Sequence, residues 1–162
     1  AICLNWASRP GNELPMLIIV TNNQYGISTP FEQVQGARII ARRGEPFGIR
    51  WDVVDGNDPV AAHNKLSQVM AYIRKERKPF VLEVYVSRLL GHSSSSGAER
   101  VDERDCVTDY EQQLVKQGVL KKGEGAELRA RFEDEMRKDL EKVRAEPKPD
   151  PSSIYDHVFV ES

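Results

Sequence analysis

The sequence contains few of the residues that build disulfide frameworks and metal clusters. Two cysteines, Cys3 and Cys106, and three histidines occur in 162 residues. The cysteines lie far apart and match no metal-binding or redox spacing, so we expect reduced, buried thiols rather than a disulfide. The histidines, at positions 63, 92 and 157, are too scattered to predict a zinc site.

Long hydrophobic runs and an excess of one charge are also absent. No run approaches the roughly 18 apolar residues that span a bilayer, and no basic and apolar leader precedes Ala1. The chain has 23 basic and 25 acidic residues, without a concentrated basic face, and neither common glycine-rich phosphate motif occurs. We therefore expect an intracellular protein with neither nucleic acid nor membrane as a partner.

Three apolar runs predict strands, at residues 16–21, 49–54 and 80–90. The first is rich in β-branched residues and is typical of a strand that is covered on both faces. Between the runs lie two helix starts, one with Thr29 as the cap and a break near Gly36, the other after the turn at residues 55–59. This alternation predicts an α/β fold with a parallel sheet and flanking helices.

The composition changes to charged helix from residue 98 onward. We predict a helical extension at residues 98–146 and a proline-rich, extended arm at residues 147–162. Ile154 and Tyr155 would dock this arm on a neighbour. Apolar residues at helical spacing form a short and a long stripe in this part, which we interpret as packing surfaces. They are Tyr110, Leu114 and Val115, then Leu128, Phe132, Met136, Leu140 and Val143.

A first polar cluster, at residues 22–26, follows the first predicted strand. Ligands of parallel α/β sheets bind at the carboxyl ends of the strands. An asparagine carboxamide and a free main-chain carbonyl are hard oxygen ligands that suit magnesium. The alternative is an Asn/Gly turn whose side chains satisfy their own backbone, and the spacing alone favours that alternative.

A second polar cluster, "RLLGHSSSSGAER" at residues 88–100, follows the third predicted strand. His92 could donate to a phosphate or move a proton, because its ordinary pKa lies near neutrality. A lone loop histidine is more often a solvated polar residue. A serine-hydrolase elbow is disfavoured, because Gly91 is followed by His-Ser-Ser-Ser and not by the required Gly-x-Ser-x-Gly pattern.

Five stretches, taken in order, add a family resemblance to these patterns: "LNWA", "VTNNQYGISTP", "VDGNDPVAAHNKL", "PFVLEVYVSRLLGHS" and "PDPSSIYDHVF". Together they resemble the alpha subunit of the thiamine diphosphate-dependent decarboxylase of 2-oxo-acid dehydrogenase complexes, of the pyruvate and branched-chain type. The resemblance implies that residues 1–97 are the C-terminal part of the cofactor-binding domain. Its motif begins with Gly-Asp-Gly about thirty residues before the paired asparagines, so we expect this chain to begin inside the motif and to be inactive alone.

The resemblance also implies roles for individual residues. Asn23 would give its side-chain oxygen, and Tyr25 its main-chain carbonyl, to a magnesium ion that bridges the diphosphate of the cofactor. Ile27 would lie against the cofactor. His92 would contact the cofactor and assist acyl transfer, and Ser93 matches a serine that is phosphorylated in mitochondrial relatives.

The implied reaction is the oxidative decarboxylation of a 2-oxo acid with reductive acylation of a lipoyl group. The implied partners are a beta subunit or beta domain in an alpha2-beta2 type assembly and a lipoyl-bearing acyltransferase. The location would be the bacterial cytoplasm or the mitochondrial matrix. Leu89 and Leu90 replace the tyrosine and histidine of pyruvate-type relatives, which gives a lean toward a branched substrate. The alternatives are a transketolase-like enzyme and a non-catalytic α/β interaction module.

Overall fold

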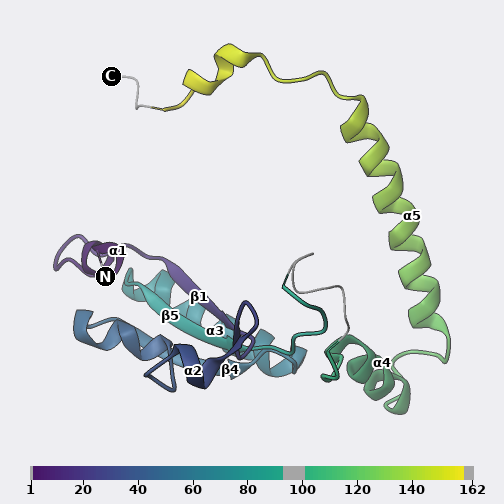
Figure 1. Ribbon diagram of the computed structural model, residues 1–162, viewed down its shortest axis with the longest axis horizontal. Helices are drawn as coiled ribbons and strands as arrows, with labels where there is room; N and C mark the ends of the chain where they lie inside the picture. The colour runs from purple at the N-terminus through teal and green to yellow at the C-terminus, as the bar shows by residue number, and fades with distance from the viewer. Residues whose placement is uncertain (1, 93–100, 159–162) are drawn as a thin grey trace. The chain divides into compact units, whose positions relative to one another are not determined.

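The computed structural model describes residues 2–92 and 101–158. The chain forms two compact units, residues 1–113 and 114–162, and each is described by itself. The first unit contains the sheet (Figure 1). Ser93, together with most of the serine-rich loop, lies outside the described residues.

A three-stranded parallel sheet forms the centre of the first unit. Its strands are β1 (Leu17–Asn22), β4 (Arg50–Asp55) and β5 (Phe80–Tyr85), in the order β1-β5-β4. Both neighbours align in register with β5, since Leu17 and Arg50 both pair with Phe80. The predicted α/β fold with a parallel sheet is therefore confirmed, and the three strands end at the same edge of the sheet.

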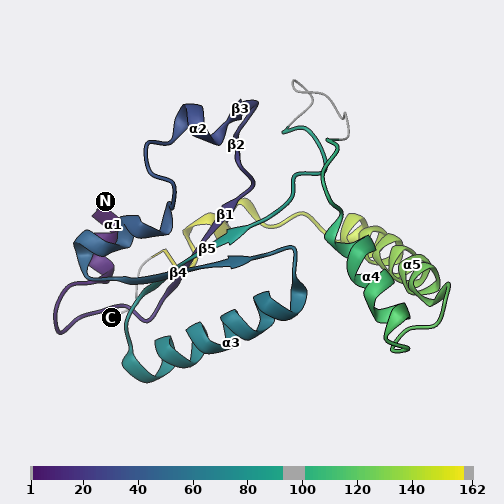
Figure 2. The ribbon, with the colours of Figure 1, turned by 90° about the horizontal axis from the view of Figure 1, so that it is seen from below.

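Helix α3 (Pro59–Glu76) covers one face of the sheet. It begins where the sequence predicts, because the Asp58 carboxylate accepts hydrogen bonds from the amides of Val60 and Ala61. Its predicted apolar side contacts the sheet: Val69 and Ile73 are buried in one cluster with residues of β4 and β5. Figure 2 shows this helix along one side of the strands.

The opposite face of the sheet is covered by two short helical segments. These are α1 (Ile2–Ala7) and the 3₁₀ helix η1 (Ala41–Phe47). Ala41 and Val81 form the buried centre of this layer with Ile49, and Leu4 packs against them. The side chains of β5 alternate between the two layers, so Phe80 and Leu82 face α3 while Val81 faces η1.

The strand that is covered on both faces is β5 and not the predicted first strand. Residues Phe80 to Glu83 are all buried, whereas Ile19 on β1 remains 53% exposed. Both runs are apolar, and the difference arises because β5 lies between two strands and β1 at the edge of this sheet. Strand β5 also ends at Tyr85, while the apolar run continues to Leu90.

A small hairpin follows β1 and leads into a single helical turn. Its strands are β2 (Tyr25–Gly26) and β3 (Thr29–Pro30), and α2 (Phe31–Val34) comes next. The prediction that Thr29 caps this helix was wrong. Thr29 pairs with Gly26 in the hairpin, and Pro30 occupies the cap position without a side-chain hydrogen bond.

The remaining helices are α4 (Cys106–Lys116) and α5 (Glu124–Ala145). Within the second unit, α5 exposes the predicted long stripe, with Phe132, Met136 and Val143 each more than half exposed. Ion pairs one turn apart, such as Lys138 with Asp134, line the helix. The predicted arm contains a 3₁₀ turn, η3 (Pro151–Tyr155), whose start is capped by Asp150.

Both cysteines are free thiols, but they are not buried as predicted. Cys3 is exposed on α1, and Cys106 is partly exposed at the start of α4. Cys3 belongs to the outer side of a six-residue helix, and only Ala7 of that helix is buried. Among the helices of the described residues, none is both long and apolar enough to cross a bilayer.

Gly56, at the end of β4, has no room for a side chain. Its amide donates to the Tyr85 carbonyl at 2.7 Å, and a Cβ atom there would lie 2.9 Å from the same oxygen and closer still to Val84. We expect Gly56→Ala to lower the free energy of unfolding by about 1–3 kcal/mol in urea denaturation, because β4 or β5 must shift. Gly36→Ala is the matched control, since no atom lies within 4 Å of its Cβ position; equal effects of both substitutions would contradict the prediction.

Candidate functional site

The carboxyl ends of β1 and β5 carry the two predicted polar clusters. Because these strands are adjacent and in register, residues 22–27 and 86–92 leave the sheet side by side. The amide of Val86 donates to the carbonyl of Asn22 at 3.0 Å, which fixes one exit against the other. The topology therefore brings the first cluster and the described start of the second, residues 88–92, to one edge of the sheet, as the sequence predicts.

Asn22 is buried, and the oxygen of its side chain has no lone pair left for a ligand. Its Oδ1 accepts from the backbone amide of Gln24 at 3.0 Å and from Gln24 Nε2 at 2.8 Å. Its Nδ2 donates to Glu83 at 2.6 Å. With both lone pairs of Oδ1 engaged, Asn22 belongs to the internal structure of the turn.

Asn23 and Tyr25 present the oxygen atoms that remain open. Asn23 Oδ1 accepts one bond, from the Tyr25 amide at 3.1 Å, and keeps a second lone pair. The Phe31 amide donates to the Gln24 carbonyl, so the neighbouring pair of Tyr25 with Pro30 is the non-hydrogen-bonded pair of the hairpin. The Tyr25 carbonyl therefore points away from the opposite strand.

Ile27 lies at the tip of the hairpin in a strained conformation. Its φ is 59°, in the left-handed region that a β-branched residue rarely occupies, and its side chain is 60% exposed. The turn of two residues between Gly26 and Thr29 requires a positive φ at its first position. An apolar side chain is thus held out of the protein beside Asn23 and Tyr25.

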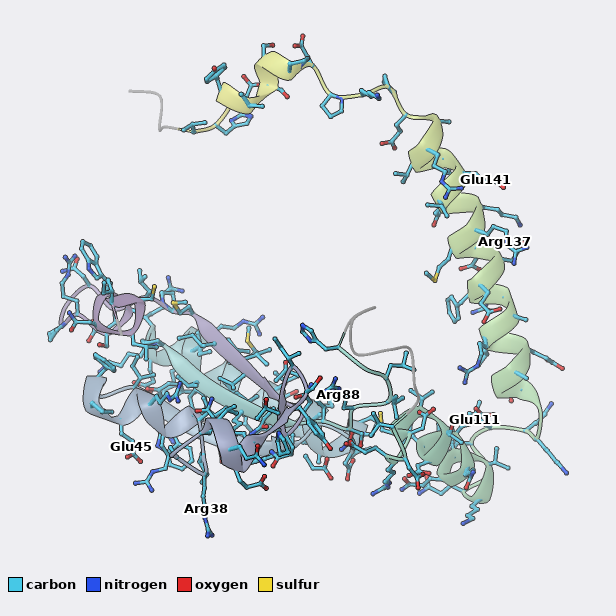
Figure 3. The ribbon with its side chains drawn as sticks, viewed as in Figure 1. Arg38, Glu45, Arg88, Glu111, Arg137 and Glu141 are labelled. Carbon is cyan, nitrogen blue, oxygen red and sulfur yellow. The ribbon has the colours of Figure 1, made fainter. Side chains whose placement is uncertain are left out.

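Arg88 joins the hairpin to the second cluster. Its guanidinium lies 4.9 Å from the ring centroid of Tyr25, and it donates to the carbonyl of Ile27. Its Nε also donates to the Leu90 carbonyl at 3.0 Å. Figure 3 labels this side chain, which lies by the carboxyl ends of the strands. The exits of β1 and β5 are therefore held together by side-chain contacts as well as by the sheet.

His92 is exposed at the end of the described segment, two residues beyond Leu90. The chain returns to this segment after residue 100: the amide of Val101 donates to the Leu89 carbonyl at 3.0 Å, and Glu103 accepts from the Arg88 amide at 2.7 Å. The loop that carries His92 is thus closed at its base. Leu89 is half-buried there, and Leu90 is 58% exposed.

The polar loop after β4 serves the fold and offers little to a ligand. Asp55 accepts from the Asn57 amide, and Asp58 caps α3. Asn57 Oδ1 accepts from the Ser87 amide at 2.9 Å, which ties this loop to the exit of β5. No group of three histidine, cysteine, aspartate or glutamate residues in the described part of the chain could hold a metal ion. The atoms that this site offers to a metal ion are therefore the open oxygens of Asn23 and Tyr25.

The sequence reasoning missed two residues that organise this edge, Glu83 and Arg88. Each carried a signal. Glu83 is a carboxylate inside an otherwise apolar strand, where burial is unfavourable without partners, and it is fully buried in the structure. Arg88 lies three residues beyond the same strand, but its stacking on Tyr25 depends on a contact across 63 residues that no local pattern encodes.

A family model for the dehydrogenase E1 component matches residues 4–152, which is most of the chain. The chain belongs to the dehydrogenase E1 component family. The match includes both polar clusters and all three strands of the sheet. It confirms the family that the five sequence stretches indicate. Membership of this E1 family implies thiamine diphosphate and magnesium as cofactors.

Curated relatives of this E1 chain are alpha subunits of two kinds. The pyruvate dehydrogenase E1 component subunit alpha of Rickettsia bellii is 25% identical over 155 residues, 91% of this chain and 48% of that protein. The human mitochondrial 2-oxoisovalerate dehydrogenase subunit alpha is 28% identical over 159 residues, 92% of this chain and 36% of that protein. The chain therefore spans half or less of the length of these relatives.

We expect Arg88→Gln to loosen the hairpin of this E1 chain, because it removes the stacked cation from Tyr25. Such contacts at exposed sites are worth about 0.5–1 kcal/mol. Nuclear magnetic resonance should show the ring protons of Tyr25 moving toward solvent-like shifts. Arg38→Gln, which changes another exposed arginine of the same unit, should leave them in place (Figure 3). Unchanged Tyr25 shifts in Arg88→Gln would contradict the proposed contact.

Proposed function

We propose that this chain is the alpha part of a 2-oxo-acid dehydrogenase that holds the magnesium and diphosphate end of thiamine diphosphate. The observation that carries the proposal is the pair of successive asparagine turns at the end of β1. They engage both lone pairs of Asn22 Oδ1 and leave Asn23 Oδ1 and the Tyr25 carbonyl open at the ligand-binding edge of a parallel sheet.

The residues of this turn fit a magnesium ion. Magnesium prefers oxygen ligands and usually keeps waters and phosphate oxygens in its shell, so two protein oxygens are a sufficient contribution from this loop. Asn23 and Tyr25 would hold the metal and, through it, the diphosphate. Ile27, held outward by the turn, would provide an apolar contact to the cofactor beside them.

The cofactor, when bound, supplies the electron sink that makes decarboxylation of a 2-oxo acid possible. His92 would contact the cofactor and act as a proton donor during acyl transfer to a lipoyl group. Its exposure, just beyond the Leu89–Val101 hydrogen bond that closes the base of its loop, supports this role, since a carrier-bound lipoyl group must approach from solvent. Ser93 would follow it as a candidate phosphorylation site.

The kinds of relatives found support a proposal for the substrate and the partners. These relatives are named for pyruvate and for 2-oxoisovalerate, and we place this chain nearer the branched-chain kind, because Leu89 and Leu90 add aliphatic surface beside His92. A beta subunit or domain would complete the cofactor site in an alpha2-beta2 type assembly. A lipoyl-bearing acyltransferase would receive the acyl group.

Isothermal titration calorimetry of the intact protein with thiamine diphosphate tests the cofactor assignment. We expect binding in the presence of magnesium and its loss when the metal is chelated. Asn23→Ala should weaken magnesium-dependent binding by at least roughly tenfold, since even outer contacts to a metal site are worth that much. Asn12→Ala, at an exposed asparagine away from the turn, is the control.

The outcome of that titration also separates the alternatives. Absence of cofactor binding would favour a non-catalytic α/β module. Binding without turnover of any 2-oxo acid by the assembly with a lipoyl acceptor would favour a transketolase-like enzyme. Decarboxylation coupled to acylation of the lipoyl acceptor would support the proposal.

The role of His92 predicts a separation between binding and catalysis. We expect His92→Ala to slow acyl transfer to the lipoyl acceptor by about a hundredfold or more, which is the usual contribution of a positioned proton donor, with a smaller effect on cofactor affinity. His63→Ala changes an exposed histidine on α3 and should leave both quantities unchanged. Acyl transfer at the normal rate in His92→Ala would exclude this role.

A further inference from the structure

Glu83 is a carboxylate in the interior of the sheet. It lies on the central strand β5, between Leu82 and Val84, and its exposed fraction is 0%. A buried carboxylate is unfavourable unless every oxygen is well hydrogen-bonded, and an apolar residue of similar volume is often at least as stable in such a place. Its presence in this strand therefore calls for a reason beyond packing.

Two groups from different parts of the fold donate to this carboxylate. Asn22 Nδ2 donates to Oε1 at 2.6 Å, and the Ala41 amide, at the start of η1, donates to Oε2 at 2.8 Å. Partial burial, together with the negative charge of Glu83, raises the pKa of the Tyr85 hydroxyl on the same strand. Glu83 thus connects β1, β5 and η1 at the face opposite α3.

The contact with Asn22 determines how the turn after β1 is built. An asparagine side chain can rotate to exchange its oxygen and nitrogen, and a neighbour that can only accept hydrogen bonds removes this freedom. Because the Glu83 carboxylate accepts, Nδ2 of Asn22 faces it and Oδ1 faces Gln24. Both donors of Gln24, its amide and its Nε2, then bond to this one oxygen.

Gln24 needs that support, because its backbone is in the left-handed region with a φ of 63°. Residues other than glycine adopt this conformation only when the surroundings compensate for the strain. Gln24 lies between Asn23 and Tyr25, so its conformation directs the Asn23 side chain and the Tyr25 carbonyl. A line of hydrogen bonds therefore runs from the buried Glu83 through Asn22 to Gln24, which lies between the two residues with open oxygens.

The geometry points to Glu83 as a positioning residue: by fixing the amide orientation of Asn22, it sets the Asn23–Tyr25 turn in the conformation that presents two oxygens to the metal. The inference rests on the proposed function for the metal itself. The conformation of the turn does not, because it is a property of the chain without ligand.

Three variants of the full chain test the inference. In Glu83→Gln, the side-chain amide at position 83 must turn its oxygen to the Ala41 amide and its nitrogen to Asn22. Two hydrogen-bond donors, this nitrogen and Asn22 Nδ2, then face each other. In Asn22→Asp, two carboxylates meet. The double variant Glu83→Gln with Asn22→Asp exchanges amide and carboxylate, so that position 83 again contacts position 22 by one hydrogen bond and Gln24 keeps its acceptor. Glu45→Gln is the control, at a surface carboxylate bonded to Trp51 and Arg42.

Two readouts follow the turn and the site separately. Hydrogen exchange by mass spectrometry should show residues 21–31 exchanging roughly tenfold faster in each single variant, while the β4–β5 ladder at residues 51–55 keeps its protection. Magnesium-dependent thiamine diphosphate affinity should fall by about 10- to 100-fold in the single variants. The double variant should recover both quantities, and the control should change neither.

The outcomes separate this inference from the function on which it rests. If the unsubstituted protein binds no magnesium and cofactor, the proposed function fails, and the exchange data still decide whether Glu83 sets the turn. If Glu83→Gln leaves residues 21–31 unchanged, or lowers protection equally throughout the sheet, Glu83 is not a positioning residue. Should the single variants not fold, a double variant that folds with a protected turn supports the inference, and one that does not recover overturns it.

Discussion

The pairing of β5 with both of its neighbours is the interaction on which the rest of the first unit depends. This strand carries the buried residues of both layers, and its register fixes where β1 and β4 end. Since parallel strands end at the same edge, the register also decides which loops can meet. The turn after β1, the loop after β4 and the segment that leads to His92 leave the sheet together because β5 holds the two outer strands in step.

Much of this arrangement could be predicted from local patterns, and the failures have physical causes. The start of α3 was predictable because its signal is local, a capping aspartate followed by proline. Burial was harder, because Leu17–Val20 and Phe80–Leu82 read alike, and only the strand order makes one of them central. Thr29 and Cys3 were misread because each depended on a pairing or a contact surface that the neighbouring sequence does not contain.

Prediction of the candidate site from local sequence has a similar limit. Asn23, Tyr25 and Ile27 were selected by family resemblance, whereas turn chemistry alone favoured a turn that satisfies itself. The structure contains the self-satisfied turn, and the metal-binding role stays a prediction. Asn22 Oδ1 accepts two bonds within the turn, and Asn23 accepts one internal bond and retains capacity for another. One turn can therefore satisfy its own backbone and still offer an oxygen to a metal. The internal hydrogen bonds of Asn22 hold Asn23 in place.

At one position of the hairpin after β1, the atom that is open to a ligand does not depend on which amino acid is present. At position 25 the open group is a main-chain carbonyl, so any amino acid would carry it, and its direction comes from the alternation of hydrogen bonds between Gln24 and Phe31. The tyrosine ring, in contrast, stacks against the guanidinium of Arg88. Variation at this position would thus be invisible to a comparison of side chains while the ligand atom persisted. An insertion of one residue that shifted this pairing by one position would turn that oxygen inward without changing any functional side chain.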